Sequence, residues 1–453
     1  MSTSTTTGTT AVRLAMVYVG VAESTSDPIM SPPLGVQLLA TVARRAGHDA
    51  EVFDNRRPGS LLDRVGAFKP TVVGFSFLSI AAAEAARLAD ECHVAGWLTV
   101  AGGIHSTVFG AELLATNGGA FDVVVTGEGE VAIEAVCAAL ASGEWPTGLI
   151  AGTPVATLDE LPFPDDFAEY GPVLSDPARS HRTAALQLNR GCPMNCQFCE
   201  VSRDAALFEL PRNDRRRTTA TALRDIDQLV TRYGTNYLVL VDSIATLNDA
   251  AIAELLLGVD ARWPEMAVQL NSHVNKIGVG FLQACAQLKD RASVWIGFES
   301  GSQTILDLIK KETRAGQAER IAVQILATGA RLGVNLLLGL PGETAATRAE
   351  TMAFAEGLKA AETYADQVML NPNVFNPLPG SPLFAPMVRD GRRRQASGPL
   401  GDYRVRTIDD LEAGDVPLHG VDYSPVIAEY RALWALRGRV ADPQYRPWVE
   451  AGS

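Results

Sequence analysis

Short apolar runs alternate with amphipathic stretches through the first third of the chain. The runs are short enough to be buried strands, and the stretches between them repeat apolar residues at helical spacing. The predicted strands are 12–19, 50–53, 71–77, 98–101 and 123–126, and the predicted helices are 34–46, 81–89, 109–114 and 130–141. This alternation is typical of a parallel sheet covered by helices on both faces. Residues 11–150 are therefore predicted to form a doubly wound, Rossmann-like α/β domain.

The same alternation returns after residue 182. The predicted strands are 183–188, 237–241, 266–270, 293–298, 334–338 and 367–370, with helical stretches such as 221–233 and 344–360 between them. These βα units predict a partial (β/α)6 barrel of the TIM type over residues 183–390. In both sheets, ligands are expected beyond the carboxyl ends of the strands.

Three further segments complete the predicted organisation. Residues 1–10 are rich in Ser, Thr and Gly and lack the basic and apolar parts of a leader, so they are predicted to be a disordered tail. Residues 151–182 begin with a Pro- and acid-rich stretch and are predicted to be a linker. Residues 391–453, which include Trp434, Tyr445 and Trp448, are predicted to form a small helical extension that closes the barrel.

Composition and charge exclude some classes of function. Carboxylates outnumber Lys and Arg by 52 to 39, and the net charge of -13 argues against a surface that coats nucleic acid. Two basic clusters, at 215–217 and 392–394, are expected to be solvated faces. No apolar run reaches 18 residues, so no membrane span is expected, and the chain is placed in a reducing cytoplasm.

Three cysteines share one short loop, Cys192, Cys196 and Cys199, with spacings of x3 and then x2. A [4Fe–4S] cluster usually takes four thiolates, so three ligands leave one iron open to a substrate-like ligand. Structural zinc normally needs four ligands, and a disulfide framework would leave one of these thiols unpaired. The remaining cysteines are scattered singly and are expected to be inert core residues: Cys92, Cys137 and Cys285.

The cysteine loop, with the preceding segment 189–191 and Phe198 inside it, resembles the motif of the radical S-adenosylmethionine (radical SAM) superfamily. The resemblance implies a [4Fe–4S] cluster on the three thiols and S-adenosylmethionine as its partner. It also implies contacts to S-adenosylmethionine from residues at later strand ends, where a carboxylate can accept hydroxyl or ammonium protons. The implied S-adenosylmethionine contacts are Phe198, Asp242, Ser243, Glu299, Ser300, Gly339, Pro341 and Gly342. No side chain is assigned a catalytic role.

Loops rich in Gly and hydroxyl residues follow the predicted strands of the first domain, and in their order they resemble the cobalamin-binding domain that precedes the barrel in one radical SAM subclass. The implied corrinoid contacts are Ser76, Ser79, Gly102, Gly103, Thr126, Gly127 and Glu128. No His follows the first strand, so the resemblance supplies no lower ligand for cobalt. Two alternatives stay open, a domain that binds cobalamin and a degenerate domain that has lost it.

The resemblance implies reductive cleavage of S-adenosylmethionine to a 5′-deoxyadenosyl radical, which abstracts hydrogen from a small molecule such as a sugar or natural-product intermediate. With cobalamin bound, C-methylation is favoured. With a degenerate first domain, radical dehydration of an aminosugar diol, epimerisation or cyclisation would take its place. A non-catalytic iron–sulfur or corrinoid sensor is the alternative of another class. An external one-electron donor of the flavodoxin or ferredoxin type is expected.

Overall fold

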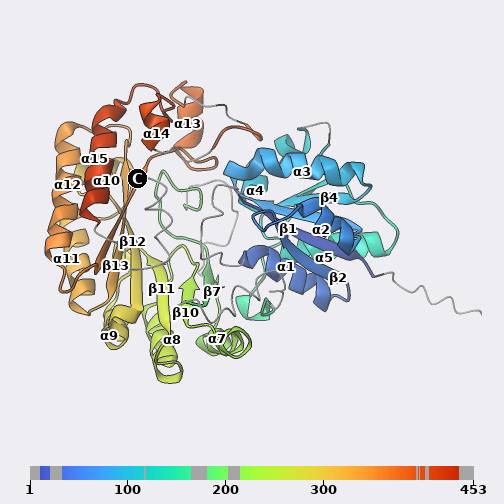
Figure 1. Cartoon of the computed structure of the whole chain (residues 1–453), viewed down its shortest axis with the longest axis horizontal. Coiled ribbons are helices and arrows are strands. Elements are labelled where there is room, and N and C mark those ends of the chain that lie inside the picture. The colour runs from blue at the N-terminus through green and yellow to red at the C-terminus, as the bar shows by residue number, and fades with distance from the viewer. Residues whose placement is uncertain are drawn as a thin grey trace, which may run out of the picture.

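The computed structural model describes residues 11–20, 33–116, 119–164, 181–202, 215–393, 396, 398–403 and 408–437. The predicted tail at 1–10, and Tyr445 and Trp448 of the predicted extension, lie outside these residues. Two α/β domains lie side by side, and the chain that follows the barrel returns toward the first domain (Figure 1). Both predicted sheets are present and parallel.

The first sheet has six parallel strands in the order β2-β1-β3-β4-β5-β6. Its strands are β1 (Arg13–Val19), β2 (Asp49–Asp54), β3 (Val72–Phe77), β4 (Leu98–Gly102), β5 (Val123–Thr126) and β6 (Gly148–Ala151). The first five match the predicted runs, whereas β6 was not predicted, because this short edge strand has only partly exposed and exposed residues. The strand order reverses between β1 and β3, which is where such sheets place their ligands.

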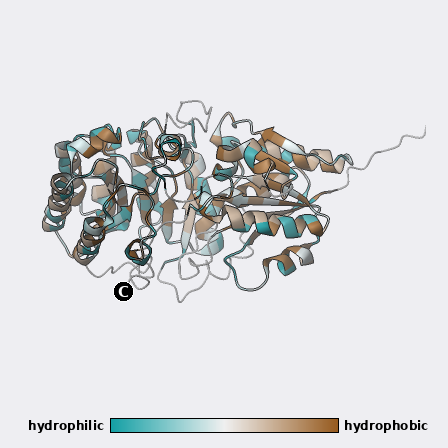
Figure 2. Cartoon of the chain, turned by 90° about the horizontal axis from the view of Figure 1, so that it is seen from above, coloured by the Kyte–Doolittle hydropathy of each residue, from teal (hydrophilic) through white to brown (hydrophobic). Residues whose placement is uncertain are grey.

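Helices cover both faces of this sheet (Figure 2). They are α1 (Leu34–Arg45), α2 (Leu61–Phe68), α3 (Ala82–Val94), α4 (Ile104–Leu114) and α5 (Glu130–Ala141). The helices α1 and α5 share one apolar core with the sheet, and α2, α3 and α4 share the other. The sequence pattern missed α2, and α4 begins five residues earlier than predicted, so part of the expected Gly-rich loop is helix.

The second sheet has six parallel strands in the order β14-β13-β12-β11-β10-β7. Its strands are β7 (Thr183–Leu186), β10 (Tyr237–Leu240), β11 (Ala267–Ser272), β12 (Ala292–Glu299), β13 (Arg331–Leu338) and β14 (Val368–Val374). The helices that cover it are α7 (Thr219–Tyr233), α8 (Asp249–Arg262), α9 (Val279–Leu288), α10 (Gln303–Leu308), α11 (Ala315–Ala327) and α12 (Ala345–Ala360). The predicted partial barrel is confirmed.

Alternation along each barrel strand separates the core from the interior of the barrel. On β12, Val294, Ile296 and Phe298 pack into the apolar core with the surrounding helices. Each such fully buried side chain contributes about 1.5–3 kcal/mol to folding. Trp295 and Gly297 take the alternate positions on this strand and therefore face the inside of the barrel.

The chain after the barrel contributes to both domains. It contains α13 (Phe384–Arg389), α14 (Ile408–Glu412) and α15 (Tyr423–Leu436), and α15 packs against β14 and α12. Tyr403 is buried in the core of the first domain beside α3 and α4. In the segment between the domains, Leu158 and Leu161 join the core of the first domain, while Phe163 joins that of the barrel.

The expectation of a solvated basic face is wrong for 215–217 and wrong at Arg393, whereas Arg392 is exposed as expected. Arg215 and Arg217 are buried and paired with Glu128 and Asp225, and Arg393 is buried and donates to backbone carbonyls. Sequence alone shows a run of like charges but not which carboxylates and carbonyls receive them in the fold. Among the described helices, none is long and apolar enough to cross a bilayer.

Candidate functional site

The three clustered cysteines lie directly after β8 (Asn189–Arg190), between the two strands of a short sheet that follows β7. This sheet pairs β8 with β9 (Arg215–Arg216). The loop is held from both sides at Gln197, whose N–H donates to the carbonyl of Ile309 at 2.9 Å and whose carbonyl accepts from the N–H of Leu383 at 3.0 Å. The cysteine loop therefore lies between the α10–α11 connection and the segment before α13, in the space between the two sheets (Figure 1).

The thiols share one apolar environment. Cys196 is buried with Met194 and Ile244, and Cys192 and Cys199 are partly buried against the same cluster. Burial raises the pKa of all three thiols, to about 11 for Cys196 and about 12 for Cys199, although Lys311 lowers that of Cys196. Within the described residues, no three His, Cys, Asp or Glu side chains already stand at metal-binding spacing. Three soft thiols on one loop are nevertheless a donor set that fits an iron–sulfur cluster with one open iron.

A buried ion pair lies beside this loop. Glu299, at the end of β12, accepts a hydrogen bond from Lys311 at 2.9 Å, and both side chains are less than 10% exposed. Burial lowers the pKa of Lys311, but Glu299 and the nearby thiols outweigh burial and hold it above its ordinary value. The ammonium also lies 5.6 Å from the ring centroid of Phe198. Glu299 therefore sits next to the cysteine loop, as the resemblance implies, but its carboxylate is already paired.

The backbone at Glu299 is strained. Its φ of 64° lies in the left-handed region, and the pairing of β12 with β13 shifts register between Gly297 and Glu299. Such conformations cost on the order of 1–3 kcal/mol in a residue other than glycine and concentrate at functional sites. A side chain on Gly297 would meet the Glu299 carboxylate at 2.2 Å, so the glycine leaves room for the ion pair.

The two residues predicted at the end of β10 differ in their environment. Asp242 is buried, and its carboxylate accepts from the backbone N–H groups of Leu188 at 3.0 Å and Asn189 at 2.5 Å. Asp242 thus braces the segment that enters the cysteine loop. Ser243 is exposed at the mouth of the barrel. Of the two, Ser243 is the one whose side chain faces solvent.

The predicted motif after β13 forms a tight turn. Gly339 and Gly342 have φ values of 78° and 92°, and Pro341 is buried. The Gly339 N–H donates to Glu343 at 2.8 Å, and burial raises the pKa of that carboxyl to about 7. Phe198 packs against the apolar cluster of Leu340 from this turn as well as against the cysteines, so it joins the two motifs.

One further predicted residue is directed away from the mouth of the barrel. Ser300 is 2% exposed, and its hydroxyl bonds Thr351 of α12 at 2.8 Å. Ser300 therefore ties the end of β12 to a helix on the outside of the barrel.

The predicted corrinoid contacts gather at the carboxyl edge of the first sheet. Gly103, at the start of α4, has φ 93° and lies against the Ser76 hydroxyl, which would be 3.2 Å from an added Cβ. The Gly127 N–H donates to Thr107 at 2.9 Å. Gly102 and Thr126 are partly exposed at the same edge. The small residues leave backbone open to a flat ligand there, which fits a corrinoid.

Two of the predicted corrinoid contacts have side chains that are bound within the protein. Ser79 is buried, and its hydroxyl donates to Nδ1 of His105 at 2.9 Å while Nε2 of that histidine donates to the carbonyl of Pro399 at 2.8 Å. Glu128 is buried and accepts from Arg215 and Arg190 of the second domain. Burial raises the pKa of Glu128, but the two guanidinium groups more than offset it and hold the pKa below its ordinary value.

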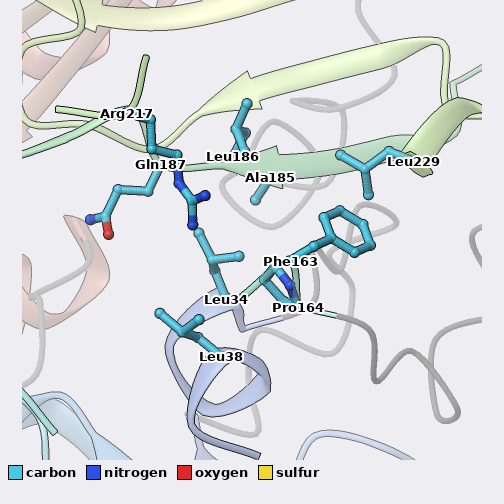
Figure 3. Close-up of a pocket in the computed structure, with 9 residues that line it drawn as sticks. All are labelled: Leu34, Leu38, Phe163, Pro164, Ala185, Leu186, Gln187, Arg217 and Leu229. Carbon is cyan, nitrogen blue, oxygen red and sulfur yellow. The ribbon is translucent and has the colours of Figure 1, made fainter. Parts of the chain in front are cut away.

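A separate, small pocket lies between the domains. Figure 3 shows apolar side chains of α1, of the segment between the domains, of β7 and of α7 around it, with Gln187 and Arg217 as its polar members. None of the cysteines and none of the predicted cofactor contacts lines it. The pocket is therefore distinct from the chemistry at the strand ends.

Sequence reasoning missed Lys311, His273, Arg190 and Arg215 as members of the site. His273 is buried, and its Nε2 donates to the Lys311 carbonyl at 3.2 Å, while burial and the charge of Lys311 lower its pKa to about 3. Arg190 and Arg215 lie in segments that the sequence analysis had singled out, the motif segment 189–191 and the basic cluster 215–217, but not as site residues. The only local signal for Lys311 is the Lys-Lys-Glu run at 310–312.

Comparisons with known families and structures agree with this division into two domains. The B12 binding domain family matches residues 25–137, and the Radical SAM superfamily matches residues 186–355. An uncharacterized methyltransferase, PH0819 of Pyrococcus horikoshii, is 25% identical over 354 residues, which cover 72% of this chain and 73% of that protein. The anaerobic magnesium-protoporphyrin IX monomethyl ester cyclase of Rubrivivax gelatinosus is 25% identical over 381 residues, which cover 78% of this chain and 66% of the cyclase.

Among solved structures, the radical S-adenosylmethionine methyltransferase TsrM of Kitasatospora setae superposes with a TM-score of 0.68 at 16% identity. The superposition covers 96% of this chain and 90% of TsrM. At this identity the likeness concerns the fold, and it extends over both domains.

Proposed function

The chain joins a B12-binding domain to a radical SAM domain, and on that premise we propose that it is a cobalamin-dependent radical SAM methyltransferase that acts on a small molecule. The observation that carries the proposal is the placement of the three-cysteine loop between two parallel sheets, because the carboxyl edge of each sheet then flanks one space. Relatives described as a methyltransferase and as TsrM support methylation.

The residues present suit the groups that this function needs. Cys192, Cys196 and Cys199 would hold a [4Fe–4S] cluster, and the backbone around Gly102, Gly103 and Gly127 would hold the corrinoid. When bound, the cluster supplies one-electron reduction of S-adenosylmethionine and the corrinoid supplies a transferable methyl group.

The chain's own side chains have separable tasks at the barrel mouth. Lys311 places a positive charge beside the cysteine loop, where thiolates and a carboxylate of S-adenosylmethionine need compensation. Glu299 balances that ammonium and lies at hydrogen-bond reach of the same space. Phe198, which packs on the buried Leu340, can stack on adenine and exclude water.

The cysteines also bear on the electron donor and the compartment that we propose. A one-electron donor of the flavodoxin or ferredoxin type would reduce the cluster, since the other three cysteines are singly buried and do not form a second cluster that could relay the electron. The reducing cytoplasm is the compartment in which such thiols stay available.

The test is anaerobic purification of the full chain from cobalamin-supplemented cells. A corrinoid absorption band at one equivalent per chain is expected, together with formation of both 5′-deoxyadenosine and S-adenosylhomocysteine when reductant and S-adenosylmethionine are added. Reductive cleavage accounts for the first product, and loss of the methyl group from S-adenosylmethionine accounts for the second.

Other outcomes distinguish the alternatives. Deoxyadenosine without corrinoid and without S-adenosylhomocysteine would replace methylation by dehydration, epimerisation or cyclisation. Neither product, with cluster and corrinoid both bound, would indicate a sensor. The match to a B12-binding domain disfavours the degenerate-domain alternative.

A further inference from the structure

A single buried carboxylate of the first domain is held by two arginines of the second. Glu128, in the loop after β5, accepts from both terminal nitrogens of Arg215, one of them at 3.0 Å, in a bidentate pair. Arg190 approaches the same carboxylate at 3.1 Å. All three side chains are at most 14% exposed. Bidentate Arg–carboxylate pairs fix geometry as well as charge, because two parallel hydrogen bonds define the plane of both groups.

The two arginines belong to the two-stranded sheet that flanks the cysteine loop. Arg190 on β8 and Arg215 on β9 are directly opposite each other in the antiparallel pair. Arg190 stands two residues before Cys192 in the chain. A displacement of Glu128 is therefore transmitted through one side chain to the base of the cysteine loop.

On the other side, Glu128 belongs to the loop 126–130 whose backbone lies at the corrinoid edge. Further bonds hold this loop in place. Arg190 donates to Glu130 at 2.6 Å, the Val155 N–H donates to Glu128 at 3.0 Å, and Arg215 donates to the Val155 carbonyl at 2.8 Å. The network has two positive and two negative side chains, so its charges balance inside a buried interface. Such an interface tolerates few alternative arrangements.

We propose that Glu128, Arg190 and Arg215 are positioning residues that couple the corrinoid edge to the cysteine loop, and that Glu128 is not itself a corrinoid contact. The inference rests on the proposed function, because it assigns the corrinoid to that edge. Coupling between two sites is reciprocal, so a corrinoid on one edge changes the affinity for S-adenosylmethionine at the other. The network is the physical connection through which the two occupancies affect each other.

The test compares the full, cluster-reconstituted chain with its E128Q variant, which keeps the shape of the side chain and removes its charge. The affinity for S-adenosylmethionine is measured with and without hydroxocobalamin, and the affinity for hydroxocobalamin is measured by absorbance. In the wild type, hydroxocobalamin is expected to change the S-adenosylmethionine affinity by about fivefold or more, the lower end of typical coupling. In E128Q the change is expected to fall below about twofold, with hydroxocobalamin still bound.

A matched control is D159N. Asp159 also bonds across the domains, but its carboxylate accepts from the Thr218 N–H at 2.9 Å and from the Thr218 and Thr221 side chains, rather than from Arg190 or Arg215. This variant is expected to keep the wild-type coupling. R215K, which keeps the positive charge but cannot form the bidentate pair, is expected to show intermediate coupling, and it replaces E128Q if that variant does not fold.

Three results would overturn the inference. Wild-type coupling in both E128Q and R215K would show that the network transmits nothing. Loss of hydroxocobalamin binding in E128Q with unchanged iron content and S-adenosylmethionine affinity would make Glu128 a corrinoid contact. Failure of the wild type to bind hydroxocobalamin would remove the proposed function together with this inference, whereas the first two results leave the proposed function intact.

Discussion

The carboxyl edges of the two sheets present different chemical groups to a ligand. Each is the ligand side of a parallel sheet. The edge of the first sheet consists of backbone, glycine and hydroxyl groups, such as Ser76, Gly103 and Gly127. The edge of the barrel has three soft thiols and the buried Glu299–Lys311 pair. A ligand held by shape and backbone leaves a weak trace in a sequence, whereas a ligand held by coordinating side chains leaves a strong one.

A buried neutral histidine also lies at each edge, and the two histidines have different partners. His105 joins Ser79 of the first edge to Pro399 from the chain after the barrel. His273 joins β11 to the carbonyl of Lys311 beside the cysteines. The first histidine links a domain edge to a distant segment, and the second supports the charged group of the site.

The largest effect on the barrel edge is expected from substitution of Cys196. Replacement by Ala is expected to abolish both iron binding at this loop and formation of 5′-deoxyadenosine, because two thiolates cannot hold the cluster. Iron content and deoxyadenosine are measured after anaerobic reconstitution. Cys285→Ala, in the barrel core, is the control and should keep both. Full iron content in the Cys196 variant would contradict the assignment of the three thiols.

Lys311→Met is expected to have the next largest effect. It leaves the Glu299 carboxylate buried without its partner, at a cost of about 3–5 kcal/mol in unfolding free energy. Adding Glu299→Gln to the same chain should recover most of that stability, because no buried charge remains, but should not recover binding of S-adenosylmethionine. Urea unfolding and a binding titration measure the two effects. Recovery of binding in the double variant would mean that the pair is structural only.

Gly103→Ala tests whether the first edge depends on backbone shape. Its φ of 93° and ψ of -170° are accessible almost only to glycine, so the cost is on the order of 1–3 kcal/mol. Hydroxocobalamin binding is expected to weaken by about tenfold, equivalent to about 1.4 kcal/mol, with iron content unchanged. The alanine variant of the exposed Gly47, also at positive φ but at the end of α1, is the control for strain alone. Equal loss of binding in both variants would contradict a role for the edge.

An effect of similar size is expected in the pH dependence of stability at His105. Burial lowers its pKa from 6.5 to about 4, so the folded protein holds it neutral while the unfolded chain protonates it. Its contribution to stability is therefore present above pH 6.5 and is lost as pH falls toward 4. Between pH 7.5 and 5 the loss amounts to about 2 kcal/mol. His105→Gln should reduce the pH dependence of urea unfolding by that amount and leave the similar contribution of His273, whose pKa is lowered to about 3. An unchanged slope would contradict the assignment.

The sequence by itself determined the elements and the strongest site. Periodicity is local, so it predicted most strands of both sheets, including β5 and the helix α5 to the residue. The spacing of Cys192, Cys196 and Cys199 is also local, and their chemistry permits few interpretations. The short elements β6 and α2 were not predicted, because an exposed edge strand and an eight-residue helix have little periodic signal.

Only the tertiary structure decided which charges belong to the site. Glu128 and Arg215 are 87 residues apart in the chain, and Asp242 reaches back 54 residues to the start of the cysteine loop. Nothing in the local pattern of an arginine run distinguishes a solvated face from a buried pair, because the difference lies in partners that only the fold brings together. Burial, and with it the strength of a charge, is a property of the packed molecule.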